Sequence, residues 1–386
     1  MAFGNWSSQR GINLRIRWQM KKRLVLSIVL GLVALALVIP GGLYLYSLYR
    51  YGEIPKIDHA DVSAIISGAP FDVLIAGSDS RAGLTTAQQK EYGNETETVG
   101  SRSDVTMILR VDPTAKKIAV LSIPYDTVVP IAGTRTTNEI SAALNLGPGT
   151  LVQTVEQDFH IPINAFVSVN FNGVLKLTQA LGGINVYFPF PSKDKMSGLS
   201  QNAGCQLLNG TQALALARSR FFYYYENGKW QYDDTGEFGR IHRQHTVIRA
   251  MISKAESSML GNPLALNRFI GTAVHDVSIS RGLSFSQLVR LALDFRSFSS
   301  TNLSTMTLPT QIGYEGVYAG LPVPSWNLDA KVISQVLSSG SHPADKQGTG
   351  RTSVASTAIP GPQLPSSGAV FAGENGSRPN FDPTSC

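Results

Sequence analysis

Short runs rich in valine, isoleucine and leucine alternate with segments of helical periodicity from Phe71 onward. The runs predicted as strands are Asp72–Gly77, Asp104–Val111, Lys117–Ile123, Ala165–Asn170, Ile184–Phe188 and Leu303–Leu308. The segments predicted as helices are Thr150–Phe159, Phe171–Leu181, Gly210–Arg220, Gly239–Leu260, Ser284–Phe298 and Leu328–Leu337. Because strands and helices alternate in an irregular order, the sequence predicts an α/β protein with a central mixed sheet sandwiched by helices.

A charge-free apolar segment from Leu24 to Tyr46 precedes this region. About 20 apolar residues span the hydrocarbon core of a bilayer, so the segment is predicted to form a transmembrane helix. More basic residues stand before it than shortly after it, which places the N-terminus in the cytoplasm and the bulk of the chain outside the cell. The alternative is a cleaved signal peptide, but the run is long for one and no clear cleavage site follows. The favoured prediction is therefore an uncleaved signal-anchor in a single-pass protein of the cell membrane.

Composition divides the chain further. The predicted parts are a basic cytoplasmic tail (1–23), the transmembrane helix (24–46), a spacer (47–69), an extracytoplasmic globular domain (70–338) and a flexible tail rich in Ser, Gly and Pro (339–386). The formal net charge of +6 suits an anionic membrane face, a phosphorylated substrate or nucleic acid. No basic stripe or known nucleic-acid module stands outside the N-terminal tail, so nucleic acid is not expected as a partner.

The chain contains two cysteines, Cys205 and Cys386. A location outside the cytoplasm makes a disulfide chemically possible. We hypothesise that the two residues pair and hold the C-terminal tail, and the alternative is two free thiols.

Two aspartates stand at the ends of predicted strands. Asp79 follows the first strand in a turn of glycine and serine, and Asp104 opens the second strand. Carboxylates in these positions can share one divalent cation, and hard oxygen ligands suit Mg²⁺ (or Mn²⁺). Either aspartate alone is better explained as a turn cap. Together with the nearby arginines, the pair predicts a metal site.

Basic and amide side chains that could bind an anion occur beside these aspartates and in two later segments. They are Arg81, Arg102, Arg218, Arg220, Arg240, Arg243 and Gln244. Arg218 and Arg220 stand two positions apart, so they can converge on one anion only where their helix ends.

The second segment places Arg240, Arg243 and Gln244 on one helix face in what is expected to be the first turn. Cations there oppose the helix dipole unless an anion accompanies them, which indicates an anion site. The alternative is a solvated helix start in which the arginines pair with Glu237 or Asp234.

Other features carry less chemistry. His242 and His245 lack further metal ligands at matching spacing and are expected to be ordinary surface or edge histidines. The aromatic cluster Phe221–Tyr225 could line a lipid entrance, although packing of a loop is the better explanation.

Five ordered motifs between about Phe71 and Glu256 are similar to those of the LytR-CpsA-Psr family of bacterial cell-wall enzymes. They read FDVLIAGSDSR, RSDVTMILRVDPTAKKIAVLSIPYDT, LGGINV, LNGTQALALARSR and GEFGRIHRQHTVI. The resemblance implies a phosphotransferase that moves a glycosyl phosphate from a polyprenyl-diphosphate-linked glycan to the 6-hydroxyl of muramic acid in peptidoglycan. It also implies an apolar lipid pocket, although helix faces around Phe159, Leu175 and Val247 could equally form an ordinary core.

The resemblance also implies roles for single residues. The metal carboxylates fall on Asp79 and Asp104. The catalytic residues are expected to be Asp79, Asp104, Arg102, Arg218 and Arg220. The pyrophosphate ligands are expected to be Arg81, Arg102, Tyr125, Arg218, Arg220, Arg240, Arg243 and Gln244. The tail composition and the cysteine pair resemble actinobacterial members, which favours arabinogalactan as the transferred polymer over teichoic acid or capsular glycan.

The chain departs from the family pattern at three positions, one of which is Ser141 in place of the usual asparagine. Tyr125 replaces the usual arginine of the SIPRDT motif, and Glu237 replaces the usual aspartate of the DFGR motif. Tyr125 can donate one hydrogen bond but cannot bind phosphate in the bidentate manner of arginine. A non-catalytic binder or regulator of lipid-diphosphate glycans, or a lipid pyrophosphatase, therefore stays as an alternative function.

Overall fold

The computed structural model describes residues 41–58, 60, 62–78, 103–259, 271, 276–313, 322–338, 370–371 and 386. The chain divides into two compact units, residues 1–52 and 53–386. The described part of the first unit is helical over 41–52. No helix among the described residues is both long and apolar enough to cross a bilayer, and most of the predicted transmembrane segment lies outside them.

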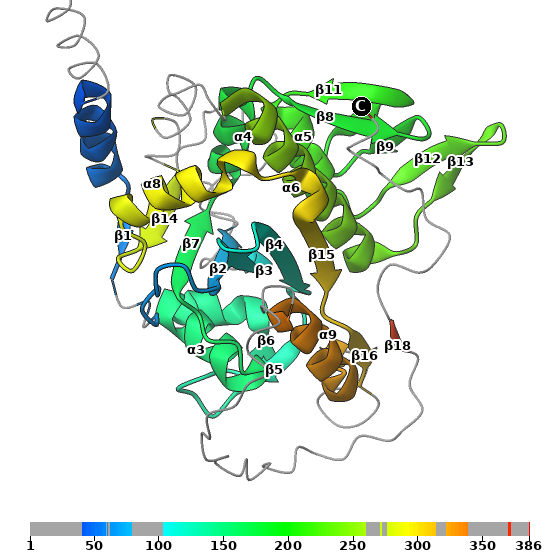
Figure 1. Ribbon diagram of the computed structural model, residues 1–386. Helices are drawn as coiled ribbons and strands as arrows, with labels where there is room; N and C mark the ends of the chain where they lie inside the picture. The colour runs from blue at the N-terminus through cyan, green and yellow to red at the C-terminus, as the bar shows by residue number, and fades with distance from the viewer. Residues whose placement is uncertain are drawn as a thin grey trace, which may run out of the picture. The chain divides into compact units, whose positions relative to one another are not determined.

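A seven-stranded mixed sheet forms the centre of the second unit (Figure 1). In spatial order its strands are β1 (Lys56–Ile57), β14 (Val277–Ser280), β7 (Ala165–Val169), β2 (Phe71–Ser78), β3 (Ser103–Asp112), β4 (Lys117–Ile123) and β15 (Leu303–Thr307). The consecutive neighbours β2, β3 and β4 pair antiparallel, whereas β7 joins β2 and β15 joins β4 in parallel. The predicted mixed sheet is confirmed.

Helices cover both faces of this sheet because the side chains of each strand alternate between two apolar clusters. Leu74 and Leu121 pack with residues of α3 (Pro148–Phe159) and α9 (Trp326–Ser338) on one face. Met107 and Val120 face α6 (Gly236–Met259) on the other. The helix α8 (Phe285–Asp294) also packs on this second face, beside Phe71 and Val73.

A second layer of structure lies beyond α6. The remaining helices of this region are α4 (Phe171–Ala180) and α5 (Gly210–Arg218), and the remaining strands are β8 (Ile184–Phe188), β9 (Ser192–Asp194), β10 (Leu199–Gln201), β11 (Gly204–Leu208), β12 (Tyr223–Glu226) and β13 (Lys229–Tyr232). The last two strands form a hairpin at the edge of the sheet β10-β9-β12-β13. The smaller strands β5 (Val128–Pro130), β6 (Thr137–Glu139), β16 (Thr310–Ile312), β17 (Pro322–Pro324) and β18 (Val370–Phe371) complete the described strands.

The helix faces expected either to line a lipid pocket or to form core belong to the core. Phe159, Leu175 and Val247 are each at most 3% exposed, and they lie in three separate apolar clusters. These three side chains therefore contribute to core packing.

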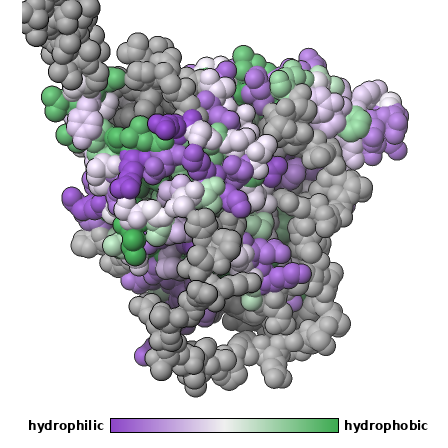
Figure 2. All heavy atoms as spheres, viewed as in Figure 1, coloured by the Kyte–Doolittle hydropathy of each residue, from purple (hydrophilic) through white to green (hydrophobic). Residues whose placement is uncertain are grey.

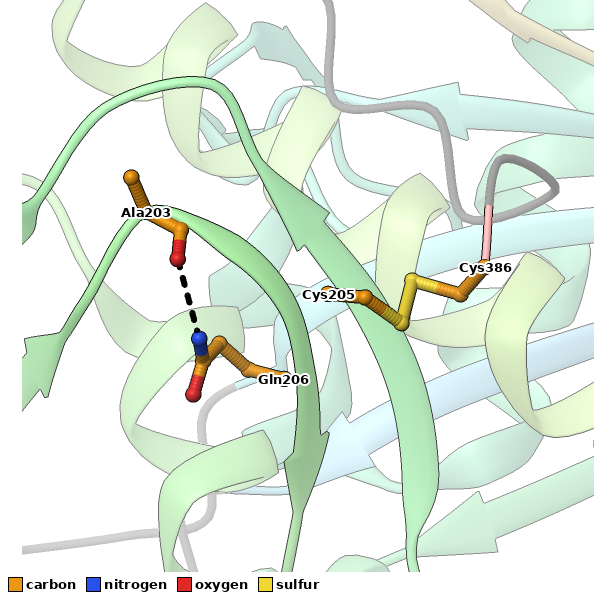
Figure 3. The surroundings of a disulfide bond; sticks show 4 residues. All are labelled: Ala203, Cys205, Gln206 and Cys386. Atoms are coloured by element: carbon orange, nitrogen blue, oxygen red, sulfur yellow. Dashed lines mark hydrogen bonds between the residues drawn. A yellow bond between two sulfur atoms is a disulfide. The ribbon is translucent and has the colours of Figure 1, made fainter.

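Cys205 of β11 and Cys386 form a disulfide, with 5.6 Å between their Cα atoms (Figure 3). The two cysteines are 181 positions apart, and closing a loop of this length stabilises the fold by about 4–5 kcal/mol in the chain-entropy model. The described parts of the predicted flexible tail are Cys386 and the short strand β18, which pairs with β16.

Candidate active site

Three predicted site residues, Asp79, Arg81 and Arg102, lie outside the described residues. The others lie at the end of the central sheet or in the segments around α5 and α6.

Asp104 lies at the start of β3, beside an irregularity in the pairing of β2 with β3 at Gly77 and Ser78. The glycine is required there, because a Cβ on Gly77 would come within 2.7 Å of the Cβ of Val105. The Asp104 side chain is partly exposed, and no other described residue donates a hydrogen bond to its carboxylate. Its main-chain oxygen accepts a hydrogen bond of 2.8 Å from Nη2 of Arg240. The backbone thus fixes Asp104 at the sheet end, where its carboxylate is partly exposed.

The end of α5 directs two arginines to different partners. An Asn209 capping box begins this helix, and Arg218 is its last residue. Ser219 has extended dihedral angles (φ −67°, ψ 117°), so the chain leaves the helix between the two arginines. The guanidinium of Arg218 lies 4.9 Å from the ring centre of Phe171, and that of Arg220 lies 4.5 Å from the ring centre of Tyr125. The helix therefore ends between the two arginines, as their convergence on one anion requires, but the two guanidiniums contact different rings.

Tyr125 is a contact shared by two arginines. Arg240 lies 4.9 Å from its ring centre, in addition to Arg220 at 4.5 Å. The face of an aromatic ring attracts cations, so one phenol ring holds two like charges together at the site. Burial raises the pKa of the Tyr125 hydroxyl, which stays protonated and can donate a hydrogen bond.

Glu237 also contacts the same two arginines. Its Oε1 accepts a hydrogen bond of 2.7 Å from Arg240, and its Oε2 lies 3.5 Å from Nε of Arg220. Burial raises the pKa of Glu237 to about 7, although both arginines favour the ionised form. Burial also raises the pKa of the neighbouring Asp126. Neither Glu237 nor Asp126 was predicted as a site residue, although Glu237 stands three residues before Arg240.

Arg243 and Gln244 have a different environment. The Nε and Nη2 atoms of Arg243 donate to the main-chain oxygen of Ser219 at 3.1 and 3.0 Å, and Nη1 donates to Asp233 at 2.7 Å. Its side chain is 2% exposed. Gln244 donates to the main-chain oxygen of Ala217 at 3.3 Å. Arg243 therefore does not present its guanidinium as a pyrophosphate ligand but holds the segments that carry Arg220 and Arg240.

The helix-dipole argument for an anion site is corrected by these contacts. The helix α6 begins at Gly236, three residues earlier than predicted, and both arginines pair with carboxylates of the protein. The expected alternative, pairing at the helix start, holds with Glu237 and Asp233 as partners, but the pairs are buried rather than solvated. The prediction for His245 was also wrong: it is 3% exposed and hydrogen-bonds Ser122 at 2.7 Å.

The arrangement brings together segments that are far apart in the sequence. Asp104 and Arg240, joined by a hydrogen bond, are separated by 136 positions, and Tyr125 and Arg220 come from two further segments. We call Asp104, Tyr125, Arg220, Glu237 and Arg240 the site cluster.

A model of the LytR_cpsA_psr family matches residues 51–337. The chain belongs to the LytR-CpsA-Psr family. The family predicted from the motifs is confirmed.

Similarity to individual members agrees with this assignment. The chain is 34% identical over 269 residues to the polyisoprenyl-teichoic acid–peptidoglycan teichoic acid transferase TagU of Halalkalibacterium halodurans, which covers 66% of this chain and 80% of the relative. It is 26% identical over 313 residues to LcpB of Corynebacterium glutamicum, named a probable cell wall biosynthesis protein (78% and 72% covered). These relatives include a named transferase, in agreement with the prediction of an enzyme.

Solved structures of this family share the fold. Bacillus subtilis TagV matches with a TM-score of 0.55 and 26% identity, over 71% of this chain and 98% of that structure. A LytR-Csp2A-Psr enzyme from Actinomyces oris matches with a TM-score of 0.58 and 22% identity, over 75% and 97%. The central sheet with its covering helices is therefore the LytR-CpsA-Psr fold.

Proposed function

We propose that this protein transfers a glycopolymer phosphate from a polyprenyl-diphosphate carrier to the 6-hydroxyl of muramic acid in peptidoglycan. The observation that carries the proposal is the site cluster, in which two arginines share one aromatic ring and one of them also contacts the strand end that bears Asp104. A relative at 34% identity is named for the transfer of teichoic acid from a polyisoprenyl carrier to peptidoglycan, which supports this class of reaction.

The chemistry requires two negatively charged phosphates to be bound beside a nucleophile. The acceptor hydroxyl oxygen forms a bond to the sugar-proximal phosphorus, the bridging P–O bond breaks, and polyprenyl phosphate leaves with the bond's electron pair. Arg220 and Arg240 are placed to neutralise the diphosphate and the charge that grows on the leaving phosphate. The proton of the acceptor hydroxyl passes to a carboxylate, for which Asp104 is the accessible described candidate.

A divalent cation fits the oxygen donors of this site. The Asp104 carboxylate is a hard ligand without a hydrogen-bond donor among the described residues, and Mg²⁺ usually takes one or two carboxylates together with substrate phosphates. The described residues contain no group of three or more His, Cys, Asp or Glu that would hold a metal by protein ligands alone. We propose that Asp104 and Asp79 hold Mg²⁺ (or Mn²⁺), which when bound would withdraw electron density from the phosphate oxygens.

One assay tests the proposed function. The full chain in detergent is incubated with a labelled polyprenyl-diphosphate glycan, Mg²⁺ and peptidoglycan. Transfer places label in the peptidoglycan, and Asp104→Asn and Arg220→Ala abolish it, while Gln206→Ala on β11 serves as a matched control. Label recovered as a free phosphorylated glycan would support a pyrophosphatase, and retained lipid binding without any product would support a binding protein.

Two further parts of the proposal concern place and polymer. We propose that residues 24–46 anchor the protein in the cell membrane with the catalytic unit outside, which requires reporter fusions to be active outside the cell only when placed after residue 46. The transferred polymer is proposed to be arabinogalactan. A co-purified lipid-linked glycan with another sugar composition would overturn that part alone.

A further inference from the structure

An exposed ladder of aromatic rings lies on one face of the β12–β13 hairpin. In this antiparallel pair Tyr223 stands opposite Tyr232, and Tyr225 stands opposite Trp230. Because side chains alternate along a strand, these four residues share one face of the hairpin. Their ring centroids are 5.1 Å apart in the first pair and 5.4 Å in the second. The rings form a continuous surface of two rows.

This face is open, whereas the opposite face is packed at Tyr224. The four rings are 38–45% exposed. On the other face Tyr224 packs against Phe190 at 5.7 Å between centroids and joins the apolar cluster beside α6. A single exposed aromatic ring is common on protein surfaces. Four exposed rings grouped on one face indicate a binding site.

The hairpin is an extension of the site cluster. Its first strand begins three residues after Arg220, and its second strand ends four residues before α6, the helix that carries Arg240. Arg243 joins the two ends by donating to Ser219 and Asp233, and the N–H of Asp233 donates to the main-chain oxygen of Phe222 at 2.8 Å. Gly239 leaves space for this clamp, since a Cβ there would come within 2.9 Å of Nη2 of Arg243. A ligand on the aromatic ladder would therefore extend from the place where the diphosphate is proposed to bind.

We propose that the ladder of Tyr223, Tyr225, Trp230 and Tyr232 binds the glycan backbone of the acceptor, peptidoglycan. This inference rests on the proposed function, because that function brings a long glycan to the adjoining site. Sugar rings have apolar C–H faces and polar rims. Tyr and Trp rings match both, since each combines a large apolar body with one hydrogen-bonding group.

The residue types of the face favour a glycan over a membrane or a second copy of the chain. The four ladder positions contain no aliphatic side chain, and in Figure 2 the projecting hairpin at the right is coloured mainly pale and purple. The only charge shown at the rings is Lys193, whose Nζ lies 3.6 Å from the centre of Trp230, so within the described residues the face lacks the several cations that a phosphate-rich donor polymer would require. An uncharged sugar backbone is the complementary ligand.

The test measures binding of the full chain to purified peptidoglycan by co-sedimentation, without any donor lipid. Tyr225→Ala combined with Trp230→Ala is expected to weaken binding roughly tenfold, because two stacked rings are lost. Tyr225→Phe combined with Trp230→Phe is expected to retain most of the binding, and Lys229→Ala on the opposite hairpin face serves as the matched control. Circular dichroism confirms that each variant is folded.

Each other outcome has one meaning. Unchanged peptidoglycan binding in the double alanine variant overturns the proposal. If the variant loses binding to polyanionic lipid vesicles but keeps peptidoglycan binding, the face binds a membrane. If it instead loses self-association in sedimentation velocity, the face binds a second copy of the chain. Either result also overturns the proposal. Asp104→Asn separates this inference from the proposed function, because it is expected to bind peptidoglycan normally while transferring no label.

Discussion

Arg240 and Arg243 stand one turn apart on α6, yet their surroundings differ completely. Arg243 uses all three of its guanidinium nitrogens, and its acceptors are a buried carboxylate and one main-chain oxygen. Within the part of the chain that the structure describes, Arg240 donates two hydrogen bonds, both from Nη2, and its Nε is buried without a hydrogen-bond partner. The rest of its position is set by the ring of Tyr125.

The comparison separates an arginine that holds the structure from one that is ready to bind. A guanidinium whose donors are all satisfied gains nothing from an incoming phosphate, because it would exchange good hydrogen bonds for others. A guanidinium held by stacking is fixed in place while part of its donor capacity stays unused. Arg220 resembles Arg240 in this respect, since it stacks on the same ring and, among the described residues, its only ion pair is a loose one of 3.5 Å with Glu237.

The largest expected effect of a single change is on stability, at Arg243. Arg243→Met removes one partner of a buried ion pair and leaves the carboxylate of Asp233 and the oxygen of Ser219 without their donors. We expect a loss of about 3–5 kcal/mol in the free energy of unfolding, measured by denaturant titration. A stable Arg243→Met protein that no longer bound polyprenyl diphosphate would reverse the roles assigned to the two arginines.

Arg240→Ala is expected to act on binding rather than on folding. Its partner Glu237 would lose a counter-charge, but a carboxyl whose pKa is already about 7 can take up a proton instead of staying charged and buried. Loss of one charge-assisted contact to the diphosphate corresponds to about 1.5–3 kcal/mol, or roughly 10- to 150-fold in Kd for the lipid measured by calorimetry. Arg249→Ala, on the same helix but bonded to Thr305, provides the control.

The strands and helices that carry these residues could be predicted from the sequence. The strand Lys117–Ile123 was predicted with its observed bounds, and the predicted helix Phe171–Leu181 differs by one residue from α4. Apolar periodicity is a local property, so it can be read without knowledge of the partners. The hairpin was missed although Asn227 and Gly228 between two aromatic runs are a recognised turn pair, and both adopt positive φ (52° and 80°).

The roles of individual arginines could not be read in this way. Helical spacing puts Arg240 and Arg243 on one face, but it does not show that Ser219, 24 positions away, will occupy the donors of one of them. The pairing of Arg240 with Glu237 was visible as a three-residue spacing, whereas the burial that raises the pKa of Glu237 depends on the whole fold. Contacts between distant segments decide which charged residues stay available.

A smaller effect is expected from changes of the ring that the two arginines share. Tyr125→Leu removes both cation–π contacts and is expected to weaken lipid-diphosphate binding by about 5- to 30-fold, since each contact contributes about 0.5–1 kcal/mol. Tyr125→Phe keeps the ring and is expected to bind almost normally if the ring is the functional part. Equal losses in both variants, measured as Kd, would instead assign the role to the hydroxyl.

The smallest expected effect is a pH dependence that belongs to Glu237. Its pKa is raised from 4.5 to about 7, so the folded state binds a proton more tightly than the unfolded state. The stability contributed by this proton is present below pH 4.5 and is lost as the pH rises through about 7. Ionised Glu237 also competes with a diphosphate for Arg220 and Arg240, so lipid affinity should fall by a few-fold across the same interval, as expected for one titrating carboxyl. Glu237→Gln should flatten both profiles.

Asp126 is the control for that assignment, because burial raises its pKa as well and it faces the same arginines. Asp126→Asn should leave the transition near pH 7 in place if Glu237 causes it, whereas removal of the transition by Asp126→Asn alone would assign it to Asp126. A lipid affinity of the wild-type protein that rises with pH would contradict the competition between Glu237 and the diphosphate. Glu237 becomes negatively charged between the two arginines as it loses its proton, so the affinity must fall with pH if the two compete. Asp233, the partner of Arg243, does not cause such a transition. Burial raises the pKa of its carboxyl, but Thr235 and Arg243 outweigh burial and hold that pKa below its usual value, outside this interval.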